Sequence, residues 1–235
     1  VWIAVPIILT KCSIIGAMSI NSAFLGHSVH NSSSVQGYIE LTSNMTGLIA
    51  MLLFGHAAGL DTIIPQGIGA NNVGRVRRGI AHYLTSTLLE LPLLLAPLCV
   101  IIAWTIKSKG TVHVSHVQLS LYLYGTNFSL AIRMLLGKLL VFTDGEVKLL
   151  YTTIASLACT IVSQGLVIWL VPESPRRLHL LLLTEVLVAL AIVLFRGIVI
   201  RWFHRPCHVY VPSWQDLRSI WTVKQWRSYF GLSFA

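Results

Sequence analysis

The chain has 235 residues, of which 55% are hydrophobic and only 11% are charged. Soluble domains carry about 25% charged residues, so this composition excludes an ordinary water-soluble domain and predicts a protein that faces lipid. The formal net charge is +9. In a membrane protein such an excess belongs to cytoplasmic loops, so no nucleic-acid partner is expected.

Six apolar segments are each near or above the roughly 20 residues that a helix needs to cross the hydrocarbon core. In chain order they cover about 1–25, 38–60, 78–105, 117–142, 148–171 and 178–203. The first has no initiator Met and no basic leader, so it is interpreted as a truncated membrane helix rather than a signal peptide. The expected fold class is therefore all-α: a polytopic membrane protein with six transmembrane helices within 1–210.

The distribution of basic residues predicts the orientation. Most Lys and Arg follow the second, fourth and sixth segments, which places those stretches and both termini in the cytoplasm. Residues 211–230 carry aromatic side chains at helical spacing and are expected to form an amphipathic helix in the cytoplasmic interface. Residues 231–235 look like the start of a seventh helix, so the natural protein is expected to continue. The plasma membrane and a vacuolar-type membrane both remain open as locations.

The stretch Gly59 to Asn72, GLDTIIPQGIGANN, is dense in glycine and contains Pro65. Residues of this kind end helices and form turns, and a basic cluster follows at Arg75, Arg77 and Arg78. The pattern predicts a loop fixed at the membrane surface. An ordinary surface loop is the alternative interpretation.

Several motifs resemble those of the multidrug and toxin extrusion (MATE) family of secondary transporters. In chain order they are FLGH (24–27), NMTGL (44–48), GLDT (59–62), PQGIGA (65–70) and the arginine pair 77–78. The tail, SWQDLRSIWTVKQWRSYFGLS, is similar to the linker between that family's sixth and seventh helices. The block 59–78 carries the specific part of the resemblance, whereas 80–210 matches in pattern only.

The resemblance implies the N-terminal lobe of a two-lobe transporter that exports organic cations by antiport of H⁺ or Na⁺. It implies no cofactor beyond the coupling ion, and a missing C-terminal lobe or a second copy as partner in the bilayer. The residues of the motif that would hold its structure are Gly59, Asp61, Thr62, Gln66, Gly69, Arg77 and Arg78. Asp61 is expected to bind backbone N–H groups at a helix end and to pair with Arg77 or Arg78.

Polar residues inside the apolar segments are candidates for the cation cavity, because ionisable groups are costly in lipid and persist mainly where they are used or paired. The candidates are Asn21, Glu40, Asn44, Glu90 and Glu185. Asn21 stands where bacterial members of the family carry a proton-accepting Asp, and Glu40 is the leading candidate to replace it because its helix carries the motifs. The alternative for each glutamate is a structural pair, for example with Lys11, or packing against protein. The asparagines could equally bond across helices.

Two other functions remain open. One is a lipid-linked oligosaccharide flippase of the same superfamily, whose cavity would be strongly basic. Only Lys11, Arg133 and Arg196 are candidates for basic residues within the spans, which argues mildly against this function. A truncated membrane protein that transports nothing is the third possibility. Enzyme activity is not expected, because the sequence has no HExxH, GxSxG or P-loop motif. The four cysteines are widely spaced and favour small buried hydrophobes over a metal site.

Overall fold

The computed structural model describes residues 32–109, 116–143, 145–172 and 175–219. This part of the chain is helical and contains no strand, which confirms the predicted all-α class for the described residues. The five long helices are α2 (Ser32–Gly69), α3 (Val73–Lys109), α4 (His116–Phe142), α5 (Glu146–Leu170) and α6 (Pro175–Ile198). After them come the short helices η1 (Val199–Phe203), η2 (Arg205–Tyr210) and α7 (Trp214–Ser219).

Five helical stretches are long and apolar enough to cross a membrane, so the chain is an integral membrane protein. They are Gly47–Gly69, Val73–Ile101, Ser120–Phe142, Glu146–Leu170 and His179–Phe203. They overlap five of the six expected segments: four have bounds within five residues of those expected, whereas Gly47–Gly69 is shifted by nine residues from the expected 38–60. The expected segment 1–25, the residues 231–235 and most of the amphipathic stretch 211–230 lie outside the described residues.

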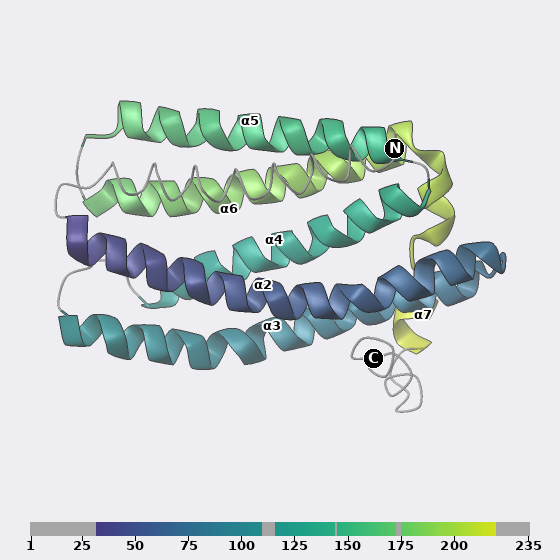
Figure 1. Ribbon diagram of the computed structural model, residues 1–235, viewed down its shortest axis with the longest axis horizontal. Coiled ribbons are helices and arrows are strands. Elements are labelled where there is room, and N and C mark those ends of the chain that lie inside the picture. The colour runs from purple at the N-terminus through teal and green to yellow at the C-terminus, as the bar shows by residue number, and fades with distance from the viewer. Residues whose placement is uncertain (1–31, 110–115, 144, 173–174, 220–235) are drawn as a thin grey trace.

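The five helices lie side by side, and α4 occupies the middle of the bundle (Figure 1). It contacts the pair α2 and α3 on one side and the pair α5 and α6 on the other. Because consecutive helices run in opposite directions, one end of the bundle collects residues 70–72, 143, 145 and 199–219. We call this the turn end.

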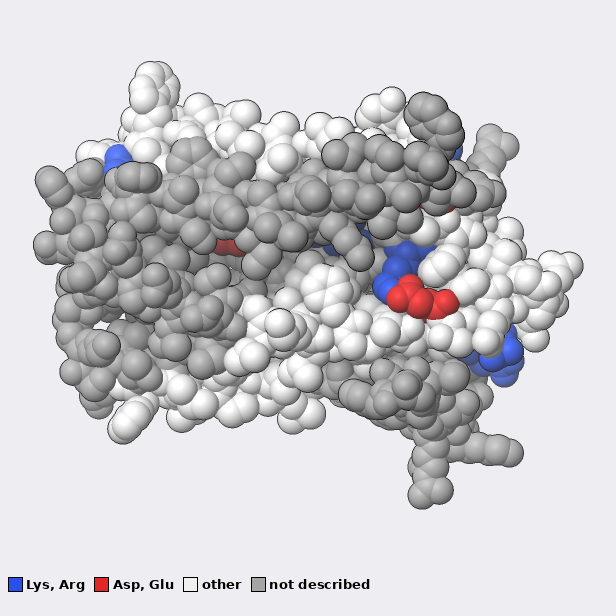
Figure 2. Space-filling model, in the orientation of Figure 1, with Lys and Arg blue, Asp and Glu red and all other residues white. Residues whose placement is uncertain are grey.

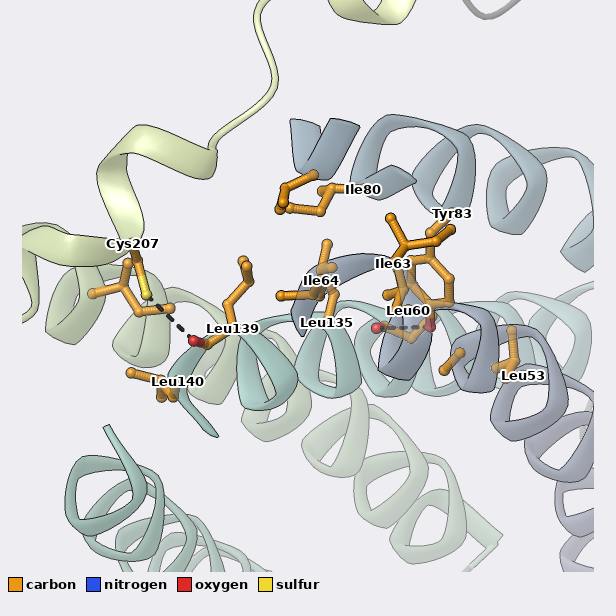
Figure 3. Close-up of a cluster of buried hydrophobic side chains, with 14 of the residues drawn as sticks. Leu53, Leu60, Ile63, Ile64, Ile80, Tyr83, Leu135, Leu139, Leu140 and Cys207 are labelled. Atoms are coloured by element: carbon orange, nitrogen blue, oxygen red, sulfur yellow. Dashed lines mark hydrogen bonds between the residues drawn. The ribbon is translucent and has the colours of Figure 1, made fainter. Parts of the chain in front are cut away.

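Buried apolar side chains are concentrated where α2, α3 and α4 meet (Figure 3). Leu53, Leu60 and Ile64 of α2 pack there with Tyr83 of α3 and Leu135 of α4. In lipid the solvent is as apolar as these side chains, so close packing and interhelical hydrogen bonds hold the helices together. The outward faces of the spans carry exposed Leu, Ile, Val, Phe and Trp side chains, as a lipid-facing surface requires.

Two adjacent asparagines build the turn between α2 and α3. Asn71 has a φ of 52°, a left-handed conformation that asparagine adopts more readily than most residues. Its N–H donates to the Ile68 carbonyl (2.9 Å) and the N–H of Asn72 donates to the Gly67 carbonyl (2.7 Å), which is the Schellman pattern of a helix C-terminus. Asn72 Oδ1 then accepts a hydrogen bond from the Arg75 N–H (3.0 Å), so it caps α3.

The predicted loop over 59–72 is therefore wrong for residues 59–69, which continue α2. Pro65 lies inside the helix. A proline removes only one intrahelical hydrogen bond, and in a membrane helix the freed carbonyl is readily satisfied by neighbouring groups. Leu60, Ile63 and Ile64 are buried against the other helices, so tertiary packing outweighs the local preference for a turn.

The chain beyond α6 crosses the turn end and packs against α3. The Arg77 guanidinium of α3 donates through Nε to the Val209 carbonyl (2.7 Å). Ser213 and Asp216 form a capping box at the start of α7, in which the Ser213 N–H and hydroxyl both donate to Asp216 Oδ2 (2.7 Å each). These bonds lower the pKa of Asp216 below its ordinary value.

Candidate functional site

An ion pair joins the middle helix to the motif that carries the family resemblance. Lys138 of α4 donates through Nζ to the carboxylate of Asp61 on α2. Asp61 lies eight residues before the end of α2, which places it about 12 Å inside the helix. The Asp61 side chain is 53% exposed and that of Lys138 is 21% exposed, so the pair is reachable from outside the helix packing.

This pairing corrects the expectation that Asp61 pairs with Arg77 or Arg78. Because α2 remains helical through Gly69, Asp61 lies beside α4 and not at a helix end. The two arginines bond elsewhere, Arg77 to Val209 and Arg78 to the Gly74 carbonyl (3.2 Å).

The other members of the motif have separate places. Gln66 Oε1 accepts a hydrogen bond from Arg75 Nη2 (2.9 Å), which links the end of α2 to the start of α3. Gly59 is buried in α2, Thr62 is partly buried, and Gly69 is exposed at the last position of the helix. The motif therefore forms the last turns of α2 and contacts two other helices, α4 through the Asp61 ion pair and α3 through the Gln66 hydrogen bond.

A second polar group lies between α2, α3 and α4. The ring of His56 hydrogen-bonds the Ser86 hydroxyl through Nε2 and stacks on Tyr83, with ring centroids 5.5 Å apart. The Tyr83 hydroxyl donates to the Ala131 carbonyl (3.1 Å). His56, Tyr83 and Ser86 are all buried, so this group ties the three helices together in the interior.

A third group lies between α4, α5 and α6 and centres on a buried arginine. Arg196 of α6 is 6% exposed. Its Nη1 donates to the Arg133 carbonyl on α4 (3.1 Å), and its Nη2 donates to Thr153 Oγ1 on α5 (2.8 Å). Glu185, one of the predicted cavity residues, lies on α6 and its carboxylate attracts the Arg133 guanidinium.

The remaining predicted cavity residues are only partly placed. Glu40 and Asn44 belong to α2 and Glu90 belongs to α3, but their side chains are outside the described part of the structure. Asn21 and Lys11 precede the first described residue. Of the five candidates, the structure thus gives side-chain surroundings for Glu185 alone.

Lys138 was not among the residues predicted from the sequence. The signal was present, because a lysine in an apolar segment is costly unless its charge is paired or reaches water. Figure 2 shows one place, to the right of the centre of the face that it draws, where blue and red atoms lie side by side, whereas most other described atoms on that face are white.

No family model matches the chain, and neither a curated protein nor a solved structure matches it.

Proposed function

We propose that this chain is one lobe of a secondary transporter of the MATE type, which exchanges an organic cation for H⁺ or Na⁺ across the membrane. The observation that supports this most is the ion pair between Asp61 and Lys138, because it joins two helices in the spans and remains partly exposed. The order and spacing of the motifs from residue 24 to residue 78 support the same family.

The pair has the chemistry that coupling requires. A carboxylate that neutralises a lysine can bind only one partner well at a time, so a proton, Na⁺ or an organic cation competes with Lys138 for Asp61. When Asp61 is protonated, the electrostatic link between α2 and α4 is lost while the apolar packing around it remains. Binding of a cation thereby changes the relative stability of two arrangements of these helices, which is the physical content of alternating access.

The test uses the natural polypeptide that contains this chain, purified and reconstituted in liposomes. A fluorescent organic cation is supplied outside, and its uptake is driven first by an acidic interior and then by a Na⁺ gradient. We expect uptake under one of the two gradients, and we expect Asp61→Asn to reduce it at least tenfold. Arg201→Gln removes a charge at an exposed position outside the motif and is the matched control, with uptake within about twofold of the natural protein.

Three outcomes are informative. Undiminished uptake in Asp61→Asn would remove the ion pair from the mechanism. Lys138→Gln should lower the concentration of organic cation that half-saturates uptake, because Lys138 then no longer competes for the Asp61 carboxylate, and an unchanged concentration would contradict that competition. No gradient-driven uptake of any organic cation would favour a membrane protein that transports nothing.

A flippase for a lipid-linked oligosaccharide is the second candidate, and the structure adds one observation in its favour. Lys138, Arg133 and Arg196 all lie within candidate spans, so the described part of the lobe is more basic inside than the sequence indicated. Transfer of a short-chain lipid diphosphate sugar between leaflets of the same liposomes separates this function from cation exchange.

A further inference from the structure

The cluster of Arg133, Arg196 and Glu185 has more positive than negative charge. Arg133 is close enough to Arg196 for the two guanidinium groups to repel each other, and Glu185 is the carboxylate that attracts Arg133. Among the described residues, these two arginines and one glutamate carry a formal charge of +1 in a partly buried part of the spans. Buried charges persist in proteins when they are paired or when they hold a ligand.

The hydrogen bonds of the two arginines are also incomplete. Arg196 is buried, and its Nε has no hydrogen-bond partner among the described residues. Arg133 is only partly buried, and within the described chain no residue accepts a hydrogen bond from its guanidinium. A guanidinium has five N–H donors in a planar fork that matches an oxyanion, so unused donors at this site are a specific feature.

The helices hold the Arg196 head firmly in position. Its two terminal nitrogens are bonded to the Arg133 carbonyl on α4 and to Thr153 on α5. Gly137, one turn after Arg133, packs close to this guanidinium, since a Cβ there would lie 3.8 Å from Arg196 Nη1. The unused Nε belongs to the same planar group, so these two bonds also fix the direction of its N–H.

We propose that Arg133 and Arg196 form a binding site for an oxyanion group, a phosphate or a carboxylate, between α4, α5 and α6. Arg133 supplies the accessible fork, Arg196 supplies a fixed charge and its Nε donor, and Glu185 limits the affinity by repelling the anion. This site is distinct from the ion pair of Asp61 and Lys138 and does not depend on cation exchange.

The depth of the site bears on the source of the oxyanion. Arg196 lies seven residues before Phe203, the last residue of its candidate span, so its Cα is about 10 Å inside that end. Thr153 lies seven residues after Glu146 and is at a similar depth. An anion dissolved in water reaches this depth only from inside the lobe, whereas a lipid headgroup lies nearer the end of the span.

The test measures binding and not transport. The natural polypeptide containing this chain is placed in nanodiscs of neutral lipid, and inorganic phosphate is added in a calorimeter at constant ionic strength. In a second arm, phosphatidic acid replaces part of the neutral lipid and its retention on the purified protein is measured. Binding in the first arm identifies a dissolved oxyanion, and binding in the second arm alone identifies a lipid headgroup.

The variants should change the affinity for the anion in opposite directions. Arg133→Gln should weaken binding about tenfold or more, because it removes charge-assisted hydrogen bonds to the anion. Glu185→Gln should tighten it several-fold, because the repelling carboxylate is gone. Arg201→Gln is the matched control, since Arg201 is exposed beyond Arg196 on the same stretch, and it should leave binding unchanged.

Folding of the variants is controlled by a second measurement. Arg133→Gln removes both the attraction to Glu185 and the repulsion of Arg196, so the two effects oppose each other and the thermal midpoint without anion should change by no more than a few degrees. Arg196→Lys keeps the charge but loses the fork, and it should also weaken binding. Absence of binding in both arms, or binding that Arg133→Gln leaves intact, would overturn the proposal.

Discussion

The guanidinium of Arg77 and the carbonyl oxygen of Val209 are 2.7 Å apart, although 132 residues separate them in the chain. This hydrogen bond ties the beginning of α3 to the segment that follows α6. It therefore joins the first described helices to the last across the turn end of the bundle.

Arg77→Gln is expected to loosen the segment 205–219. The bond is partly exposed, so its loss should cost about 1 kcal/mol and lower the thermal midpoint in detergent by about 2–4 °C. Amide hydrogen exchange in 205–219 should increase. Arg78→Gln is the matched control, because Arg78 bonds only locally to Gly74 in the described contacts, and equal exchange in both variants would contradict the assignment.

Gly67→Ala and Gly69→Ala should differ sharply although both lie in the same motif. A Cβ on Gly67 would lie 2.3 Å from the stiff, branched side chain of Val76, whereas a Cβ on Gly69 meets nothing within 4 Å. We expect Gly67→Ala to cost about 1–3 kcal/mol through overpacking of α2 against α3. Folded yield after size-exclusion chromatography measures this, with Gly69→Ala expected at the natural yield.

Tyr83 should contribute mainly by filling space. Tyr83→Phe removes the hydrogen bond to the Ala131 carbonyl, and single hydrogen bonds between membrane helices are worth about 0.6 kcal/mol on average. Tyr83→Ala leaves a cavity where the side chain is fully buried and should cost about 3–5 kcal/mol. Thermal unfolding in detergent separates the two, and a larger loss for the phenylalanine variant than for the alanine variant would refute this division.

Cys207 should react slowly with alkylating reagents. Burial raises the pKa of its thiol, while the hydrogen bond with Thr143 and the charge of Lys148 act in the opposite direction. Because the thiolate is the reacting form, alkylation by N-ethylmaleimide should increase as the pH rises through a midpoint above the ordinary thiol value of about 8.5. Mass spectrometry on a chain with the other cysteines replaced by serine gives the rate, and a midpoint below that value would contradict the assignment.

Asn72→Ala should weaken the start of α3. The Asn72 side chain caps the Arg75 N–H, and loss of such a cap costs about 1 kcal/mol. Asn71→Gly provides the comparison, since glycine adopts the left-handed conformation without strain and should be tolerated. Thermal midpoints of the two variants test this order, and the reverse order would show that the turn depends on the Asn71 side chain instead.

The positions of the helices could be predicted well because hydropathy decides them. The expected segments 117–142 and 148–171 differ by no more than two residues from α4 and α5. The prediction was wrong at 59–69. Glycine and proline favour a turn locally, but the packing of Leu60 and Ile64 against other helices keeps this stretch helical. In lipid the helix has no water to replace lost backbone bonds, so it continues where a soluble helix would end.

The partners of the charged residues could not be predicted. Asp61 and Lys138 are 77 residues apart, and their pairing depends on how α2 and α4 are rotated. Arg133 and Arg196 were visible in the sequence as basic residues near or within spans, but hydropathy does not say which face they occupy. The asparagine pair at the turn was the missed local signal, because Asn at a helix C-terminus and Asn before a helix each have a known preference.

The lengths of α2 and α3 have a mechanical consequence. At 38 and 37 residues these helices are about 57 and about 56 Å long, against about 38 Å for the 25 residues of α5. Their hairpin extends beyond the other helices at the turn end (Figure 1). It is a lever: a small tilt of the pair inside the bilayer becomes a larger displacement at residues 70–72, and a force applied at that tip is returned as torque on the ion pair of Asp61 and Lys138.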